Sequence, residues 1–343
     1  MKVLHVLNSR IYSGAEKVVC QIIKSFRGEI EMVYTSPESE IVARMLQEQG
    51  VTYLPMKTMS VSELSRVIQE QKPDLIHAHD MRAGFFSALC CGKIPLVSHI
   101  HNNAYDARGL SPKTVGYLLA GFKATRILWV SQSSFDGYAF HKLFAKKSSV
   151  LYNIIDTQQI SDKKDSDSNT YDYDMIYVGR LTFQKDPQRL MRLCARLKKD
   201  KPDLKAAIVG TGELLEEAQA LCESLNIQEN VHFLGFQSNP IKMVADSRAM
   251  ILTSRWEGTP MCALEAMYLG TPVVSTPSDG MQDLLEDGVS GYLTDDDEQM
   301  AQDLLKIFAD PAHCAFLAEN ARRKFDAIND ADAYKKAISD CYF

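Results

Sequence analysis

The stretch S-R-W-E-G-T-P-M-C-A-L-E-A-M-Y-L-G-T-P-V-V-S-T, residues 254–276, decides the fold. Its pattern predicts a strand, a loop, a helix, a turn and a second strand. Thr259 is a suitable N-cap, and Pro260 suits the first helical position, where its missing N–H costs nothing. A helix over 261–269 would then end at Gly270, and the apolar residues that follow would start a buried strand.

Two glutamates accompany this predicted helix. Glu257 lies in the loop before it and Glu265 lies inside it. The helix start near Met261 and Cys262 would offer N–H groups to an anion at the end of a strand. Carboxylates are poor phosphate ligands, but each accepts two hydrogen bonds at once, which suits vicinal hydroxyls. The combination indicates a nucleotide diphosphate that carries a sugar. The simpler alternative is a solvated loop charge and a satisfied polar residue on an amphipathic helix.

The same stretch resembles the E-x7-E motif of the family-4 retaining glycosyltransferases, enzymes of the GT-B fold. The resemblance rests on E-G-x-P-x-x-x-L-E-A-M and on the following G-T-P-V-V-S-T. It implies an α/β protein with two doubly wound Rossmann-like domains facing across a cleft. The second domain would bind a nucleotide sugar and the first an acceptor. Within the motif, the resemblance makes Glu257 catalytic and assigns substrate binding to Gly258, Thr259, Met261, Cys262 and Glu265.

Composition fits a two-domain enzyme of the cytosol. The 343 residues suffice for two domains, and no apolar run approaches the roughly 18 residues of a membrane span. The first residues, M-K-V-L, predict a strand and not a secretory segment. Eight cysteines without a C-x-x-C pair indicate a reducing compartment. We therefore expect a cytoplasmic protein, with contact at the cytoplasmic membrane face as a further hypothesis.

The domain organisation follows from pattern and charge. We expect a first domain over 1–156, a linker over 157–174, a second domain over 175–325, and a last helix over 326–343. The family architecture implies that this helix crosses back to the first domain. Residues 1–156 contain 18 Lys and Arg against 13 Asp and Glu, a net +5, whereas the remainder is −11. This asymmetry suggests domains with different partners, although scattered solvated charge explains it equally well.

The first half alternates between strand and helix patterns, which predicts right-handed βαβ units and a parallel sheet. Ligands in such sheets bind beyond the carboxyl ends of the strands. Strands are expected over 2–8, 29–35, 51–54, 74–79, 94–99, 127–131 and 149–153. Helices are expected over 14–26, 40–49, 61–71, 81–91, 113–122 and 134–144.

Two strand ends in this half carry candidate site residues. Tyr12-Ser13-Gly14-Ala15-Glu16 resembles the family's G-G-A-E signature beside the donor diphosphate, with Ser13 replacing the first glycine. Gly14 would let the backbone approach a ligand, although a lone glycine is more often just a turn. In H-I-H-N-N, residues 99–103, His101 matches the family residue that contacts the donor sugar.

Histidines also occur in His77-Ala78-His79-Asp80, which the resemblance places beside the acceptor cleft. Alternate strand residues face one side, but two histidines and one carboxylate offer too few ligands for a metal. We predict no metal here.

Residues 134–147 combine aromatic residues with Lys142, Lys146 and Lys147. Such a pattern is found on helices that lie on a membrane surface. The simpler alternative, which we favour, is a helix packed on its own sheet.

The second half restarts the sheet pattern at Met175 and supplies two cations at one strand end. In G-R-L-T-F-Q-K-D-P, Arg180 and Lys185 precede a helix predicted to begin with Asp186 as N-cap and Pro187 after it. Arg can fork across two phosphate oxygens, and Lys adds a point charge. The run resembles the family's diphosphate clamp. Further substrate-binding residues implied in this domain are Gly179, Gly210, Gly212 and Phe236. No G-x-G-x-x-G follows Gly210, so no nicotinamide cofactor is indicated.

These observations predict a retaining hexosyltransferase that uses a nucleotide-diphosphate sugar, a UDP-sugar being favoured, in cell-surface polysaccharide synthesis. The catalytic residues would be Arg180, Lys185, Glu257 and His101. The acceptor would be a glycan or a polyprenyl-diphosphate-linked glycan, and an anionic membrane is a candidate partner. We expect no cofactor and no nucleic-acid partner. A nucleotide-sugar epimerase of the same fold and a non-catalytic nucleotide-sugar-binding protein are the alternatives.

Overall fold

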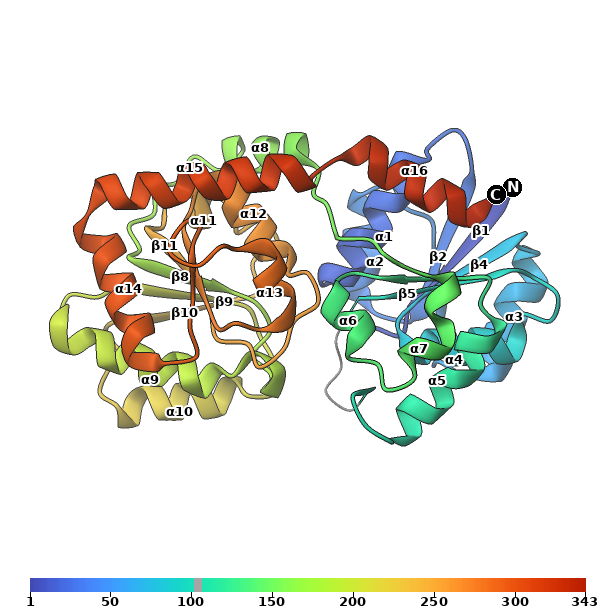
Figure 1. Ribbon diagram of the computed structural model, residues 1–343, viewed down its shortest axis with the longest axis horizontal. Helices are drawn as coiled ribbons and strands as arrows, with labels where there is room; N and C mark the ends of the chain where they lie inside the picture. Colours follow the sequence, from blue (N-terminus) through green and yellow to red (C-terminus); the bar gives the residue numbers. More distant parts are fainter. Residues whose placement is uncertain (102–106) are drawn as a thin grey trace. The chain divides into compact units, whose positions relative to one another are not determined.

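The computed structural model describes residues 1–101 and 107–343 (Figure 1). It divides into two compact units, Met1–Ile154 with Asp330–Phe343, and Ile155–Asn329. In that described part, no helix has the length and apolar character needed to cross a membrane. Each unit is a parallel sheet with helices on both faces, which confirms the α/β class.

The first unit contains a seven-stranded parallel sheet in the order β3-β2-β1-β4-β5-β6-β7. Its strands are β1 (Lys2–Val6), β2 (Glu31–Pro37), β3 (Tyr53–Met56), β4 (Leu75–His79), β5 (Leu96–Ile100), β6 (Arg126–Trp129) and β7 (Ser148–Val150). Its helices are α1 (Gly14–Ser25), α2 (Glu40–Glu48), α3 (Val61–Gln71), α4 (Met81–Cys90), α5 (Pro112–Lys123), α6 (Gln132–Asp136), α7 (His141–Phe144) and α16 (Ala331–Tyr342). The chain reverses direction across the sheet between β1 and β4, so the loops after these strands flank its switch point.

The second unit contains a six-stranded parallel sheet in the order β10-β9-β8-β11-β12-β13. Its strands are β8 (Met175–Val178), β9 (Ala206–Val209), β10 (Val231–Gly235), β11 (Ala249–Leu252), β12 (Val273–Ser275) and β13 (Tyr292–Leu293). Its helices are α8 (Thr157–Asp165), α9 (Pro187–Asp200), α10 (Leu215–Ser224), α11 (Ile241–Asp246), α12 (Met261–Leu269), α13 (Asp279–Leu284), α14 (Asp297–Ala309) and α15 (Pro311–Ile328). Here the switch point lies between β8 and β11.

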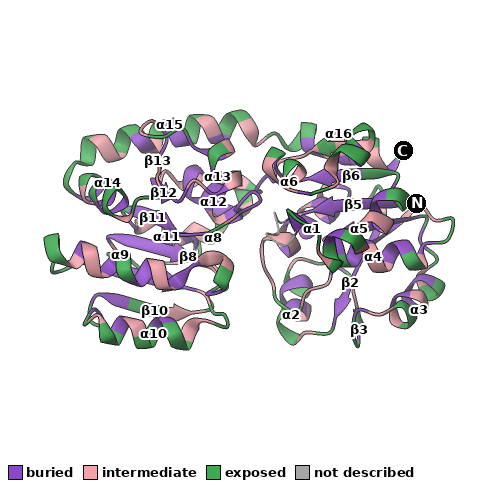
Figure 2. Cartoon of the chain, turned by 60° about the horizontal axis from the view of Figure 1, so that its bottom comes forward, coloured by how far each residue is buried: buried purple, intermediate pink, exposed green. Residues whose placement is uncertain are grey.

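Each sheet forms the centre of its unit's core. Figure 2 shows buried strands and helices whose outward faces are exposed. In the first unit Trp129 is fully buried together with Tyr117 and Tyr138. In the second unit β8 and β11 contribute fully buried apolar residues such as Ile251. Strands that are buried on both faces read as continuous apolar runs, which explains why the sequence predicted their positions well.

Three expectations were wrong in detail. The helix expected over 134–144 is divided into α6 and α7, because Gly137 ends α6 and the ring of Tyr138 enters the core, where its hydroxyl donates to Thr114 O (3.0 Å). The expected linker over 157–174 begins with helix α8, whose N-cap Asp156 accepts a hydrogen bond from Gln159 N (3.0 Å). Helix α8 buries one residue, Ile160, so it needs few apolar residues and its sequence resembles that of a linker.

The third correction concerns helix α12. Its N-cap is Pro260 and not Thr259, since Pro260 has extended φ/ψ values of −71° and 118° and its carbonyl accepts from Ala263 N (3.1 Å). The helix therefore begins at Met261. Its end at Gly270, with a positive φ of 76°, is as expected.

Candidate functional site

The candidate donor site lies at the carboxyl edge of the second unit's sheet. Because all six strands are parallel, the loops after β8, β9, β10 and β11 meet at this edge. They contain the predicted residues Arg180 and Lys185, Gly210 and Gly212, Phe236, and Glu257, respectively. The two most specific sequence motifs thus follow the two strands that flank the switch point.

A buried ion pair joins these two loops. Lys185 Nζ donates to Glu257 Oε1, and the side chains are only 12% and 6% exposed. Ser254 Oγ donates to the same carboxylate oxygen (2.5 Å). A charge removed from water requires such partners. Glu257 is therefore not a solvated loop charge, and the structure brings Lys185 and Glu257 together, a contact that sequence reasoning did not foresee.

Further contacts fix the loop over 254–260. Gln184 Nε2 donates to Trp256 O (2.9 Å), and Arg255 N donates to Gln184 O (2.8 Å). The Arg255 guanidinium bonds Asp186 (2.7 Å) and lies 4.4 Å from the centre of the Phe183 ring. Sequence reasoning missed Ser254, Gln184 and Arg255 as supporting residues, because only the fold brings the two loops together.

The glycines of this edge allow backbones to pack against each other. At Gly210, with φ +134°, a Cβ would lie 1.9 Å from Gly179 O, and at Gly212 it would lie 2.2 Å from Leu181 O. At Gly280 it would lie 1.2 Å from Gly258 O. Gly280 is a site-supporting residue that the sequence analysis did not name; it lies in the first turn of α13, which follows β12 at the same edge.

The groups that could bind an anion also lie at this carboxyl edge of the sheet. Arg180 is exposed in the loop after β8. The N–H groups of Met261 and Cys262 begin α12, where the helix dipole favours negative charge. Glu265 is 2% exposed within α12, and Phe236 is exposed directly after β10. Cations and N–H donors suit a diphosphate, and a carboxylate suits the hydroxyls of a ribose, so these residue types are those expected for the sugar-phosphate part of a nucleotide.

In the first unit, Ser13 and Gly14 open helix α1 after β1. Ser13 N and Oγ both donate to Glu16 Oε2 (2.9 and 2.7 Å), which forms a capping box. Glu16 is fully buried, and this burial raises its pKa. The acidic residue of the signature therefore holds the loop in shape, and Ser13 uses its hydroxyl for the cap.

Asp80 links the loop after β4 to the loop after β1, and these two loops flank the first unit's switch point. Its carboxylate accepts from Asn8 N (3.0 Å) and Ala83 N (2.6 Å), with a strained φ of 148°. Burial raises its pKa to about 6.

Five of the eight histidines gather on one face of the first sheet. His5 pairs in register with His77, and His79 with His99, while His101 follows β5. The nitrogens of His5, His77 and His79 lie within 4.8 Å of one another, as do those of His79, His99 and His101. Our sequence argument that too few ligands are present was therefore wrong, since three neutral imidazoles are a donor set that Zn²⁺ accepts. The absence of a metal stays a prediction. Asn102 and Asn103 lie outside the described residues.

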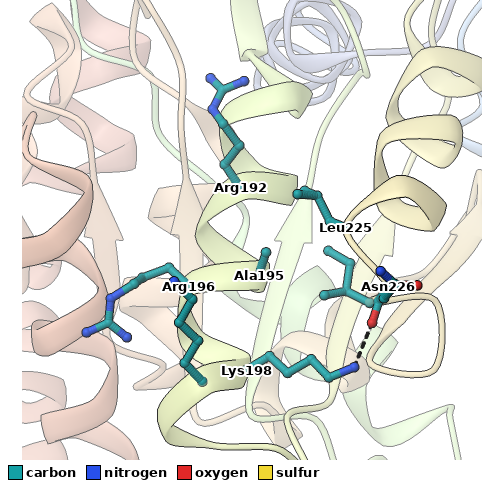
Figure 3. A pocket seen from close by; sticks show the side chains of 8 residues that line it. Arg192, Ala195, Arg196, Lys198, Leu225 and Asn226 are labelled. Atoms are coloured by element: carbon teal, nitrogen blue, oxygen red, sulfur yellow. Dashed lines mark hydrogen bonds between the residues drawn. The ribbon is translucent and has the colours of Figure 1, made fainter.

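A separate hollow between α9 and α10 is not part of this site (Figure 3). Its lining includes Arg192, Arg196 and Lys199 of α9. Arg196 already bonds Glu298 (2.5 Å), and Lys198 donates to Asn226 O (2.6 Å). Arg196, Lys198 and Lys199 lie at the end of α9 that leads into β9. This end is at the amino edge of the sheet, opposite the candidate donor site.

Comparison with known proteins follows the division into two units. Residues 13–159 match the model described as Glycosyltransferase Family 4, and residues 158–324 match Glycosyl transferases group 1. The two matches overlap at residues 158–159 and together cover 13–324, which includes every strand that the structure describes except β1. The chain belongs to the family-4 glycosyltransferases.

Individual relatives of this glycosyltransferase are distant. It is 30% identical over 62% of its length to the uncharacterized glycosyltransferase MJ1059 of Methanocaldococcus jannaschii. It is 36% identical over 48% of its length to the Campylobacter jejuni N-acetylgalactosamine-N,N'-diacetylbacillosaminyl-diphospho-undecaprenol 4-alpha-N-acetylgalactosaminyltransferase. These matches span only 58% and 45% of the relatives' own lengths.

The fold has a close structural match. The crystal structure of Anabaena Alr3699/HepE in complex with UDP-glucose superposes with a TM-score of 0.85 and 23% identity, covering 99% of this chain and 98% of that one. This agreement confirms the GT-B fold of the glycosyltransferase.

Proposed function

We propose that this family-4 glycosyltransferase moves a sugar, with retention of configuration, from a nucleotide-diphosphate sugar to a hydroxyl of a glycan or lipid-linked glycan. The observation that carries the proposal is the buried cluster of Lys185, Glu257 and Ser254 beside the start of α12. The cation and the helix N-terminus suit the negative charge of a diphosphate, and the fixed carboxylate at the same sheet edge suits the hydroxyls of the sugar.

The proposed reaction breaks the bond between the anomeric carbon and the β-phosphate oxygen. The acceptor oxygen bonds to the same face of that carbon, and its proton passes to the departing phosphate. Arg180, Lys185 and the start of α12 would stabilise the negative charge that grows on the diphosphate. Glu257 would hold Lys185 in place in the empty enzyme and bond sugar hydroxyls once the diphosphate attracts Lys185.

We further propose a UDP-sugar as donor and a diphosphate-linked lipid glycan as acceptor, in surface polysaccharide synthesis. The first suggestion is supported by UDP-glucose in the Anabaena structure, and the second by the diphospho-undecaprenol in the name of the Campylobacter relative. His101 and the Ser13–Gly14 loop would contact the donor from the first unit.

Turnover measurements test the proposal. UDP-, GDP- and ADP-sugars are first screened by thermal shift, and the stabilising donor is incubated with and without membrane lipid extract. Transfer of radiolabelled sugar only with the extract is expected. A new sugar nucleotide formed without acceptor would identify an epimerase. Donor binding without either product would favour a non-catalytic binding protein.

A further inference from the structure

The turn Phe183–Lys185, which carries the proposed diphosphate ligand Lys185, is held by one side chain of the loop after β11. This side chain is Arg255. Its Nε donates to Phe183 O (3.1 Å), and one terminal nitrogen lies 2.7 Å from Asp186 Oδ2. The guanidinium carbon also lies over the Phe183 ring, 4.4 Å from its centre. Arg255 thus contacts the chain both before and after Lys185.

The main chain of the turn is bonded to the same loop along its whole length. Gln184 O accepts from Arg255 N (2.8 Å), and Lys185 O accepts from Thr253 Oγ1 (2.9 Å). Together with the bond from Arg255 Nε to Phe183 O, each of the three carbonyls of the turn has a donor from residues 253–255. The conformation of the turn therefore depends on the loop after β11.

Asp186, the residue that follows the turn, depends on Arg255 for its charge. Asp186 has a positive φ of 50°, which few residues other than glycine adopt. Its carboxylate is buried, and Oδ1 accepts from Arg189 N (3.2 Å) as the N-cap of α9. A buried charge requires a partner of opposite sign, and Arg255 supplies it at the other oxygen. Loss of the guanidinium would therefore disturb the point at which the turn joins the helix.

The contacts of Lys185 show what this arrangement fixes. Arg255 bonds Phe183, Gln184 and Asp186, whereas the ammonium group of Lys185 bonds Glu257. Arg255 thus determines where the main chain of Lys185 lies through the residues on either side of it.

We propose that Arg255 is a positioning residue for Lys185, which it holds where the leaving diphosphate requires a positive charge. It acts through the turn and does not itself bind the diphosphate. This inference rests on the proposed function for the identity of the ligand. Lysine could not replace Arg255, because a single ammonium group cannot fork between Phe183 O and the Asp186 carboxylate while it stacks on a ring.

The position of Lys185 can be measured without substrate. Brief treatment with acetic anhydride, followed by peptide mass spectrometry, reports how often the amine leaves its ion pair, since only a free and accessible amine reacts. In Arg255→Met, acetylation of Lys185 relative to the exposed Lys199 should rise about fivefold or more, because the turn opens more often. Unchanged acetylation of Lys185 in folded Arg255→Met overturns the proposal.

Arg322 in α15 offers a closely matched control. Its guanidinium carbon lies 4.3 Å from the centre of the Tyr268 ring, Nη1 donates to Tyr268 O (2.8 Å), and Nε bonds Asp326 (3.0 Å). The side chains of Arg255 and Arg322 are similarly exposed, at 43% and 45%. Arg322→Met therefore removes the same kinds of contact and should leave the acetylation of Lys185 unchanged.

A second variant keeps the test open if Arg255→Met does not fold. Arg255→Lys retains a cation beside Asp186 but loses the fork, so acetylation of Lys185 should still rise about twofold or more. Wild-type acetylation of Lys185 in Arg255→Lys would mean that charge alone suffices, and it overturns the proposal.

A double-mutant cycle shows whether Arg255 acts through Lys185. Arg255→Met alone should lower kcat/KM for the sugar nucleotide about tenfold, because the cation is displaced from the diphosphate. In the Lys185→Ala background the same change should have less than about a twofold effect, because the group that Arg255 positions is absent. An equal fall in both backgrounds would mean that Arg255 binds the substrate or only supports the fold, and it overturns the proposal.

The two readouts separate this inference from the proposed function. If the acetylation results are as expected but the wild-type protein transfers sugar from no nucleotide sugar, the proposed function fails and the positioning of Lys185 stands. If the wild-type protein transfers sugar and Arg255→Met does so equally fast, this inference alone fails.

Discussion

The ammonium group of Lys185 bonds the carboxylate of Glu257. We propose that it also binds the diphosphate of the ligand. Arg180 has a different position, exposed after β8. The two cations of the clamp are therefore not equivalent, and their substitutions should differ in a way that the sequence alone did not suggest.

Replacing either cation by alanine should slow turnover, because negative charge on the leaving diphosphate would lose one contact, a cost of about 2–4 kcal/mol in the transition state. Arg180→Ala should keep its thermal stability. Lys185→Ala should also lower the free energy of unfolding by up to about 3 kcal/mol, because it leaves Glu257 buried without its cation. Steady-state kinetics and urea denaturation check both effects. Wild-type turnover in both variants contradicts the clamp.

Substitutions of the two glutamates should have different effects on ligand binding. Glu265→Gln should weaken both the bare nucleotide diphosphate and the sugar nucleotide, because we assign Glu265 to the ribose. Glu257→Gln should weaken the sugar nucleotide alone. Calorimetry with both ligands measures this, and equal effects of the two changes on the bare nucleotide would refute the division.

Metal removal should not change the reaction. The proposed charge stabilisation comes from Arg180, Lys185 and the start of α12, so dialysis against EDTA should leave kcat within about twofold. The check is elemental analysis of the dialysed protein beside its activity, and activity restored only by added Zn²⁺ or Mg²⁺ contradicts our expectation.

At the scale of elements, strands β1, β4 and β5 bury His5, His77, His79 and His99 completely. Burial lowers the pKa of each below 6.5, so the unfolded chain binds more protons than the folded one at acid pH. Their contribution to stability is therefore present above pH 6.5 and is lost as the pH falls below it.

Between pH 6.5 and 5.5 each such histidine should cost about 1 kcal/mol, because its pKa in the unfolded chain lies near 6.5, so the four together should destabilise the fold by roughly 4 kcal/mol. Asp80 and Glu16 act oppositely, because burial raises the pKa of each carboxyl and its protonation then stabilises the fold, but they are two groups against four. Denaturant unfolding at the two pH values measures the difference. An equal free energy of unfolding at both would show that the histidines are not buried neutral.

At the scale of the molecule, the membrane hypothesis depends on which side chains of 134–147 the first unit leaves exposed. The aromatic residues of 134–147 pack inward, with Tyr138 and Phe144 fully buried, which confirms the packing alternative for them. Lys147 is also engaged, since Nζ donates to Ala124 O (2.8 Å). Exposed apolar side chains remain at the ends of α5 and α7, where Phe122 is 67% and Leu143 62% exposed.

We therefore place the proposed membrane contact at Phe122 and Leu143 with the exposed lysines Lys123, Lys142 and Lys146. Each lysine near an anionic surface adds about 1 kcal/mol, screened by salt. The protein should sediment with anionic vesicles at low salt and not with neutral ones, and Lys123/Lys142/Lys146→Ala should release it. Lys198/Lys199→Ala in the second unit is the control. Absence of binding to either vesicle at low salt removes the hypothesis.

The sequence by itself determined the fold and pointed to the elements of the candidate donor site. Buried parallel strands require apolar runs, and a phosphate site at a strand end requires cations before a capped helix, so Arg180, Lys185 and Glu257 could be proposed from local pattern. Tertiary structure decided what depends on residues distant in the chain. It paired Lys185 with Glu257 across 72 positions, packed Gly280 against Gly258, and brought His101 together with four histidines from three strands. Local periodicity carries no information about which loops meet at a sheet edge, because strand order is set by the packing of the whole unit.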